Sequence, residues 1–313
     1  MCNLSYRTFD MIRWTVVVTG LSVITAGAPL HAQSGAQRIA ELFPDPGDAL
    51  HELCDPSAVR FIRYQATWDV PATNRDLAEV AKCRNVRTLI VRESAVSDAG
   101  LEHLSGLKRL EYLNLGDNPR IHGHGLTFLA TCPVLRHLVL SETSVTSDDV
   151  ARLRDFPALE RLDLSHTSVG DGALEFLIEL SALRSIDLSF TAITDNGLER
   201  LVALKDLQEL ALTHTRITDA GMAHIGELRS LRRLALSGTT ITDSGLKQLN
   251  RLTDLEDLHL SGNGITDDGI VALESMENLQ RLFLSETATT NDRIDKLKET
   301  LPELMVTHLP ARQ

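Results

Sequence analysis

The stretch "DLSFTAITDNGLERL", at Asp187–Leu201, decides the fold because it does not occur only once. It returns 24 residues later as "ALTHTRITDAGMAHI", at Ala211–Ile225, and again as "ALSGTTITDSGLKQL", at Ala235–Leu249. A reactive site needs one copy of its residues, whereas a motif that recurs at a fixed step is typical of a repeat architecture. The first question is therefore what each copy builds.

The repeat can be followed along most of the chain. Its first apolar residue advances in steps of 24 through Leu159, Leu183, Leu207, Leu231, Leu255 and Leu279. Extended in both directions, this step gives nine regular repeats from Val86 to about Leu301, preceded by a degenerate one from Val59 to Asn85. The consensus is L-x-x-L-x-L-S-x-T-x-I-T-D-x-G-L-x-x-L-x-x-L-x-x.

Two hydrophobic periods lie within each repeat. Leu210-Ala211-Leu212 alternates with period two, which predicts a short strand. Leu198, Leu201 and Leu204 recur at helical spacing, which predicts a short helix. One strand and one helix cannot enclose a core, but stacked copies can share one. The sequence therefore predicts an α/β solenoid, a horseshoe with a parallel inner sheet and short outer helices.

The pattern L-x-x-L-x-L-x-x-T/N-x-I/V resembles the leucine-rich repeat. Its 24-residue T-D-x-G-L form is similar to the cysteine-containing class of F-box-associated proteins and to bacterial secreted leucine-rich-repeat proteins. The resemblance covers roughly residues 59–307 and implies a non-catalytic protein-binding role. We see no F-box-like helical segment before the repeats, so an adaptor role in ubiquitin transfer is not expected.

The ends of the chain differ from the repeats. Arg13, an apolar run from about Trp14 to Leu30 and Ala32 together follow the layout of a secretory signal. We expect a signal peptide at 1–32, a leader and N-terminal cap at 33–58, the solenoid at 59–307 and a loose tail at 308–313. An exported protein is the prediction, placed in the periplasm, on the cell surface or outside the cell. An uncleaved N-terminal membrane anchor is the alternative.

The Thr-Asp-x-Gly-Leu segment lies where the loop becomes a helix. We expect the Thr or Asp oxygen to accept hydrogen bonds from the first helical turn, and the Gly to allow close approach of the neighbouring repeat. A calcium-binding ladder of carboxylates is the alternative. The Asp position is assigned to Asp98, Asp148, Asp171, Asp195, Asp219, Asp243 and Asp267.

Cysteine and histidine give little sign of chemistry. Cys83 and Cys132 occupy a slot that holds leucine in other repeats, so we expect buried, unpaired thiols. Cys54 falls in the predicted cap, and its pairing stays open. His122 and His124 could chelate a surface ion, but zinc requires three or four ligands and no third is visible. We predict no metal, no cofactor and no catalytic residues.

Charge narrows the class of partner. The chain carries a formal net charge of −12, whereas nucleic acids and anionic membranes require a basic face. We therefore expect neither nucleic acid nor a stable membrane span after cleavage of the signal. A Ser-His-Asp spacing, a P-loop and a glycine-rich dinucleotide signature are all missing from the sequence, so we do not expect an enzyme.

A partner would bind the exposed inner strand face, whose positions vary while the framework repeats. These are the third, fifth, seventh and eighth residues of each repeat. One cluster combines exposed aromatic side chains with acid in consecutive repeats, a combination typical of interface anchors, although an incidental exposed Phe would look the same. The candidate partner-binding residues are Asp163, His166, Asp187, Phe190 and His214, followed by His259 and Phe283.

These observations lead to one functional prediction and one alternative. The prediction is a non-catalytic exported scaffold that binds a protein partner through the concave strand face. The alternative is a structural cell-envelope component that assembles through its repeats without a specific soluble ligand. An apolar patch on the outer helices would favour the alternative.

Overall fold

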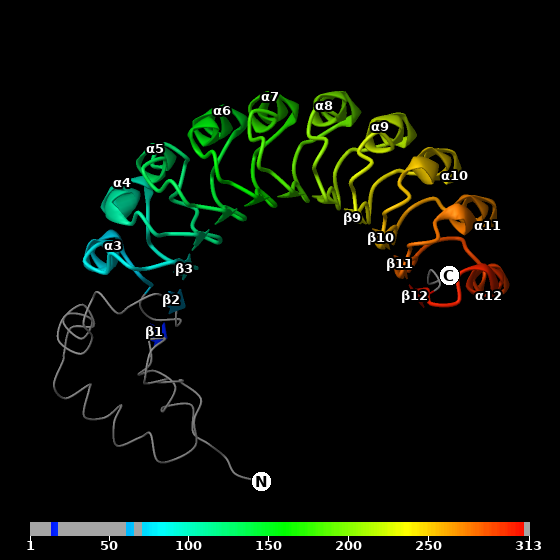
Figure 1. Ribbon diagram of the computed structural model, residues 1–313, viewed down its shortest axis with the longest axis horizontal. Coiled ribbons are helices and arrows are strands. Elements are labelled where there is room, and N and C mark those ends of the chain that lie inside the picture. Colours follow the sequence, from blue (N-terminus) through cyan, green and yellow to red (C-terminus); the bar gives the residue numbers. More distant parts are fainter. Residues whose placement is uncertain (1–13, 18–60, 66–70, 310–313) are drawn as a thin grey trace, which may run out of the picture. The chain divides into compact units, whose positions relative to one another are not determined.

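The computed structural model describes residues 14–17, 61–65 and 71–309. The predicted cap at 33–58, Cys54 and nearly all of the predicted signal peptide lie outside the described residues. The chain divides into two compact units, 1–144 and 145–313, and each is described by itself. The repeats run through both units, as the coloured ribbon of Figure 1 shows.

The first unit contains the degenerate repeat and the first regular ones. Its strands are β1 (Trp14–Val17), β2 (Phe61–Gln65), β3 (Thr88–Arg92), β4 (Tyr112–Asn114) and β5 (His137–Val139). Its helices are α3 (Asn74–Val80), α4 (Asp98–Leu101), the 3-10 helix η2 (Glu102–Gly106) and α5 (Leu126–Leu129). Strands β2 to β5 pair in parallel, and β1 pairs antiparallel with β2.

The second unit has one strand per repeat. The strands are β6 (Arg161–Asp163), β7 (Ser185–Asp187), β8 (Glu209–Ala211), β9 (Arg233–Ala235), β10 (Asp257–His259), β11 (Arg281–Phe283) and β12 (Met305–Thr307). All pair in parallel with their sequence neighbours, and the register advances by 24 residues, as in Asp187↔Ala211. The predicted parallel sheet is confirmed.

Short helices connect these strands. They are α6 (Ser147–Val150), η3 (Ala151–Asp155), η4 (Asp171–Ala173), α7 (Leu174–Leu177), α8 (Asp195–Leu201), α9 (Asp219–Ile225), α10 (Asp243–Leu246), η5 (Lys247–Arg251), α11 (Asp267–Ile270), η6 (Val271–Ser275) and α12 (Asn291–Thr300). Within the second unit, Figure 1 shows the helices on the outer side and the strands on the inner side. The predicted α/β solenoid is confirmed.

The core is the row of leucines that the repeat predicts. Leu188, Leu212 and Leu236 follow strands β7, β8 and β9 and are completely buried. Cys83 and Cys132 are buried, as expected, and burial raises the pKa of the Cys132 thiol. At the C-terminal end, α12 buries its own residues Ile294 and Leu297, and β12 extends the sheet.

The loop threonines and asparagines satisfy buried backbone groups, as predicted. Thr167 Oγ1 donates to the Leu164 carbonyl at 2.6 Å, and Thr215 repeats this bond to Leu212 at 2.6 Å. Asn263 Nδ2 reaches Leu236 O at 2.7 Å in the preceding repeat. These side chains therefore have a structural role.

The prediction for the recurring Asp was partly wrong. Its carboxylate does not cap its own helix but binds the Thr at the start of the next one. Asp243 Oδ1 accepts from Thr266 N at 2.8 Å and Asp243 Oδ2 from Thr266 Oγ1 at 2.6 Å. The Thr is the residue that caps, since Thr266 Oγ1 accepts from Asp268 N. The Asp instead links successive repeats.

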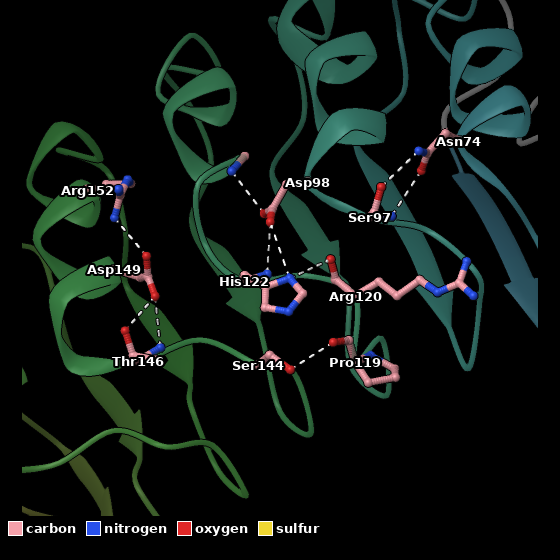
Figure 2. A network of polar contacts seen from close by, with 11 residues as sticks. Asn74, Ser97, Asp98, Pro119, Arg120, His122, Ser144, Thr146, Asp149 and Arg152 are labelled. Atoms are coloured by element: carbon pink, nitrogen blue, oxygen red, sulfur yellow. Dashed lines mark hydrogen bonds and ion pairs between the residues drawn. The ribbon is translucent and has the colours of Figure 1, made fainter.

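Asp148 was assigned to this position by mistake. Ser147 occupies it, and Ser147 Oγ accepts from Gly170 N at 2.9 Å, where the other repeats use a carboxylate. The neighbouring Asp149 closes a capping box with Thr146 and pairs with Arg152 at 2.8 Å (Figure 2). Asp148 itself is exposed.

Candidate functional site

The strand face of the second unit carries three rows of side chains. We define it as the inner side of β6–β12, which bears the third, fifth and eighth residues of each repeat. The seventh residue was predicted to join them, but Ser165 and Ser189 are buried. This face holds all seven residues that the sequence singled out.

The third-position row pairs its basic groups with an acidic side chain of the same face. Arg161 Nη1 pairs with Glu209 Oε2 at 2.9 Å, and Ser185 Oγ donates to the same oxygen at 2.9 Å. Arg233 approaches the other oxygen of Glu209. Two guanidinium groups therefore share one carboxylate, and the basic groups of β6 and β9 already have a partner within the face.

The fifth-position row places two carboxylates side by side. Asp163 and Asp187 are register partners on β6 and β7, and both are half-buried. Asp163 Oδ1 accepts from Ser165 N at 2.9 Å, and Asp187 Oδ1 accepts from Ser189 N at 2.8 Å. Burial raises the pKa of Asp187, and the charge of Asp163 raises it further, against the opposing effect of the Ser189 hydrogen bonds.

The eighth-position row has an unusual backbone conformation. His166, Phe190 and His214 all lie in the left-handed region, with φ of 55°, 56° and 53°. Gly238 and Gly262 hold the same position in the next two repeats, with φ of 63° and 69°. Left-handed backbone suits Gly and is uncommon for a bulky residue such as Phe. The aromatic side chains therefore occupy this row against the preference of the backbone.

The three rings form a continuous stack. His166 and Phe190 lie 4.0 Å apart between ring centroids with an interplanar angle of 14°, and Phe190 and His214 lie 4.6 Å apart at 35°. Phe190 remains 44% exposed although both of its faces are covered. Only the edge of its ring is therefore open to a partner. The predicted grouping of these residues is present in the structure.

His259 and Phe283 form a second, separate stack. Their ring centroids lie 4.1 Å apart on β10 and β11, and Asp257 beside them pairs with Arg281. Burial lowers the pKa of His259, an effect that Asp257 opposes. Three strand spacings separate β7 from β10, about 14 Å at roughly 4.8 Å each. The seven predicted residues therefore form two groups.

Small residues lie between the two stacks. Ala211 and Ala235 fill the fifth position on β8 and β9, and Gly238 follows in the eighth. His214 lies over Gly238, because a Cβ built on Gly238 would be only 3.0 Å from His214 Nε2 and nearer to other ring atoms. The alternation of Gly with His and Phe at one repeat position was the available signal.

His122, at the turn of the first unit, contacts a carbonyl oxygen and a carboxylate. His122 is exposed, and its Nδ1 lies 3.1 Å from the Arg120 carbonyl and 3.7 Å from Asp98 Oδ2 (Figure 2). Within residues 14–17, 61–65 and 71–309, no group of three or more His, Cys, Asp or Glu side chains could hold a metal ion. Nor does this part of the chain include a helix long and apolar enough to cross a membrane.

Two family models match the chain, both described as leucine-rich repeat, over residues 181–202 and 205–265. No curated protein sequence matches significantly. A solved internalin (inlF) from Listeria monocytogenes shares 17% identity with a TM-score of 0.54, covering 88% of this chain and 98% of that one. An internalin C2 (inlC2) from the same species shares 22% identity over 87% and 96%, with a TM-score of 0.49.

The inlF likeness concerns the fold, since the identity is low. The matched residues 205–265 include β8 to β10 with their helices, so the models and the structure identify the same repeating element. That element recurs in the first unit as well. The chain therefore contains leucine-rich repeats.

Proposed function

We propose that this protein is a non-catalytic, exported scaffold that binds a protein partner on the strand face of its second unit. The observation that carries the proposal is the His166–Phe190–His214 stack. The left-handed backbone is shared by the eighth residue of other repeats, at Glu93, Asp117, Glu142 and Glu286, so the stacked rings and not the backbone distinguish this part of the face. An exposed aromatic edge in a polar surrounding is also typical of an interface anchor.

The distribution of exposed apolar side chains supports the strand face over the outer helices. In the described part of the second unit, the large exposed hydrophobic residues are Phe190, Val271, Met305 and Leu309. Only Val271 among them belongs to an outer helix, η6. A single exposed Val is ordinary for a soluble surface and does not make an assembly patch. This favours a ligand-binding scaffold over an envelope component that packs through its helices.

Affinity capture tests the binding role. The tagged full chain should retain a defined partner, and Phe190→Ala and His214→Ala should each reduce the amount retained. Val271→Ala is the matched control, because it truncates an equally exposed apolar side chain on the opposite side. Undiminished capture by both stack variants would exclude the proposed surface.

Export rests on the sequence of the first 32 residues alone. Mass spectrometry of the protein recovered from producing cells should show a mature chain that begins near Gln33. An intact N-terminus in the membrane fraction would support the uncleaved anchor instead.

A further inference from the structure

We propose that the partner docks a basic segment here, with one Lys or Arg side chain lying along the edge of Phe190 and its cationic head at Asp163 and Asp187. This inference rests on the proposed function and specifies the chemistry of the partner. It combines three features of the strand face: two adjacent carboxylates, internal cations that are already paired, and an open aromatic edge.

The two carboxylates form an unbalanced pair. Neighbouring strands lie about 4.8 Å apart, so the register Asp163↔Asp187 sets two like charges opposite each other. Like charges in that arrangement are destabilising. Their Oδ1 atoms are held by Ser165 and Ser189, which fixes both side chains in place. A cation bound between them would relieve the repulsion.

The cations of the face are not available to balance this pair. Arg161 lies on the same strand as Asp163, two residues earlier, but its guanidinium pairs with Glu209 at 2.9 Å. Arg233 pairs with Glu209 as well. Within the described residues, the hydrogen bonds to Asp163 and Asp187 come only from Ser165 and Ser189. His166 is close enough to act on the charge of Asp187, but only when protonated.

The stack determines how a cationic side chain would lie. Because His166 and His214 cover both faces of Phe190, a cation cannot sit over that ring. The open edge of Phe190 instead suits the aliphatic stem of Lys or Arg, which commonly packs on apolar surface while its head remains polar. Asp187 precedes Phe190 by three residues, so stem and head would contact the same repeat.

Charge complementarity identifies the occupant further. The chain as a whole carries −12, which attracts a basic partner over a distance. Beyond the carboxylates, Ala211 and Ala235 give a smooth floor without a further charge. A partner segment with one or two basic residues and small neighbours fits this surface, whereas an acidic segment would meet Asp163 and Asp187 directly.

A labelled octa-arginine peptide is the probe, and its binding is measured by fluorescence anisotropy in roughly 0.1 M salt. The measurement is made at about pH 8, above the ordinary pKa values of the Asp and His side chains. The double variant Asp163→Asn/Asp187→Asn should bind about tenfold more weakly, the change expected for losing two half-buried ion pairs. Asn keeps an oxygen acceptor for Ser165 and Ser189, so the fold should survive. Phe190→Ala should also weaken binding.

The control removes the same charge elsewhere. Asp268 and Asp292 are exposed at the starts of α11 and α12, so Asp268→Asn/Asp292→Asn should change the affinity less than about twofold. Equal weakening by both double variants would reduce the effect to net charge and overturn the inference. Unchanged binding by Phe190→Ala would overturn it too, as would equal binding of octa-glutamate.

Capture experiments separate this inference from the proposed function. If capture depends on Phe190 and octa-arginine competes with the captured partner, the proposed function and the basic-segment inference are both supported. If capture depends on Phe190 but survives Asp163→Asn/Asp187→Asn, the scaffold role stands and the basic segment is wrong. If capture does not depend on Phe190, the proposed function itself fails.

Discussion

Asp171 holds Thr194 by two hydrogen bonds, from Thr194 N to Oδ1 at 2.8 Å and from Thr194 Oγ1 to Oδ2 at 2.6 Å. The two residues lie 23 positions apart and start consecutive helical segments. The same pair of bonds recurs between Asp195 and Thr218, Asp219 and Thr242, Asp243 and Thr266, and Asp267 and Thr290. This ladder explains why the Asp of one repeat and the Thr of the next recur together from Asp171 to Thr290.

Removing one carboxylate of the ladder should destabilise the second unit. Asp243→Ala removes two hydrogen bonds to a charged acceptor that is partly buried, so we expect a loss of about 1–3 kcal/mol in the free energy of unfolding. Urea denaturation measures it. Asp268→Ala is the control, because it removes the same charge from an exposed side chain. Equal losses in the two variants would contradict a specific role for the ladder.

The glycine of the Thr-Asp-x-Gly-Leu motif leaves room for the Asp carboxylate of the preceding repeat. A Cβ built on Gly197 would lie 2.5 Å from Asp171 Oδ1, and Gly221 meets Asp195 in the same way. Gly221→Ala should therefore destabilise the protein although Ala favours a helix by about 1 kcal/mol.

Gly172 provides the matched comparison. Its Cβ would meet only Ser147 Cβ at 3.9 Å, so Gly172→Ala should be neutral or stabilising. The difference between the two variants in thermal denaturation measures the steric cost alone. If Gly221→Ala raised the melting temperature as much as Gly172→Ala, the close approach would carry no energetic weight.

Packing of His214 on Gly238 gives a second matched pair. Gly238 and Gly262 have similar left-handed φ values, so Ala at either position incurs the same backbone strain. Only at Gly238 would the new methyl group displace the His214 ring, since the nearest atom to a Cβ on Gly262 is 3.5 Å away.

We therefore expect both alanine variants to lose about 1–2 kcal/mol of stability from backbone strain. Gly238→Ala alone should also reduce capture of the partner. If Gly262→Ala impaired capture to the same extent, the orientation of His214 would not matter for binding.

Asp187 links stability to pH. Because burial and Asp163 raise its pKa in the folded state, the folded protein holds this proton more tightly than the unfolded chain does. The stabilisation of the folded state by protonated Asp187 is fully present below the ordinary carboxyl pKa of about 3.9. This stabilisation is lost as the pH rises through the raised pKa of Asp187 in the folded protein.

Asp187→Asn removes the unfavourable burial of the ionised carboxylate, while the amide oxygen can still accept the hydrogen bond from Ser189 N. It should therefore be more stable than the original protein near neutral pH. The advantage should shrink as the pH falls through the raised folded pKa of Asp187, and it should be gone below the ordinary carboxyl pKa of about 3.9. Urea denaturation at several pH values checks this. A variant less stable at neutral pH would show that the charge of Asp187 is satisfied within the fold. If Asp187→Asn stabilises the protein, the native carboxylate lowers stability, as is common for a residue whose role is binding.

Which parts of the structure were predictable follows from the range of the interactions. The strand and helix of each repeat follow from local apolar spacing, so Leu188, Leu212 and Leu236 could be placed in the core before any coordinates existed. The role of the Asp could not, because its partner Thr lies in the next repeat. The mistaken assignment of Asp148 had the same origin. Ser147 accepts the hydrogen bond from the next repeat, and Asp149 caps its own helix.

The candidate site shows the same division. That His166, Phe190 and His214 share one face follows from their 24-residue spacing. The strain of their backbone, the covering of both faces of Phe190 and the pairing of Arg161 with Glu209 do not.

By itself, the sequence determined the period, the leucine core and the α/β class, since these depend on which residues are apolar and how far apart they stand. Only the tertiary structure decided which carboxylates pair with a guanidinium group, as Glu209 does, and which accept hydrogen bonds from serines, as Asp163 and Asp187 do. Hydrogen bonds and charge pairs act between different repeats, at separations of 23 residues for Asp171–Thr194 and 48 residues, or two repeats, for Arg161–Glu209. Such contacts exist only once the repeats are stacked.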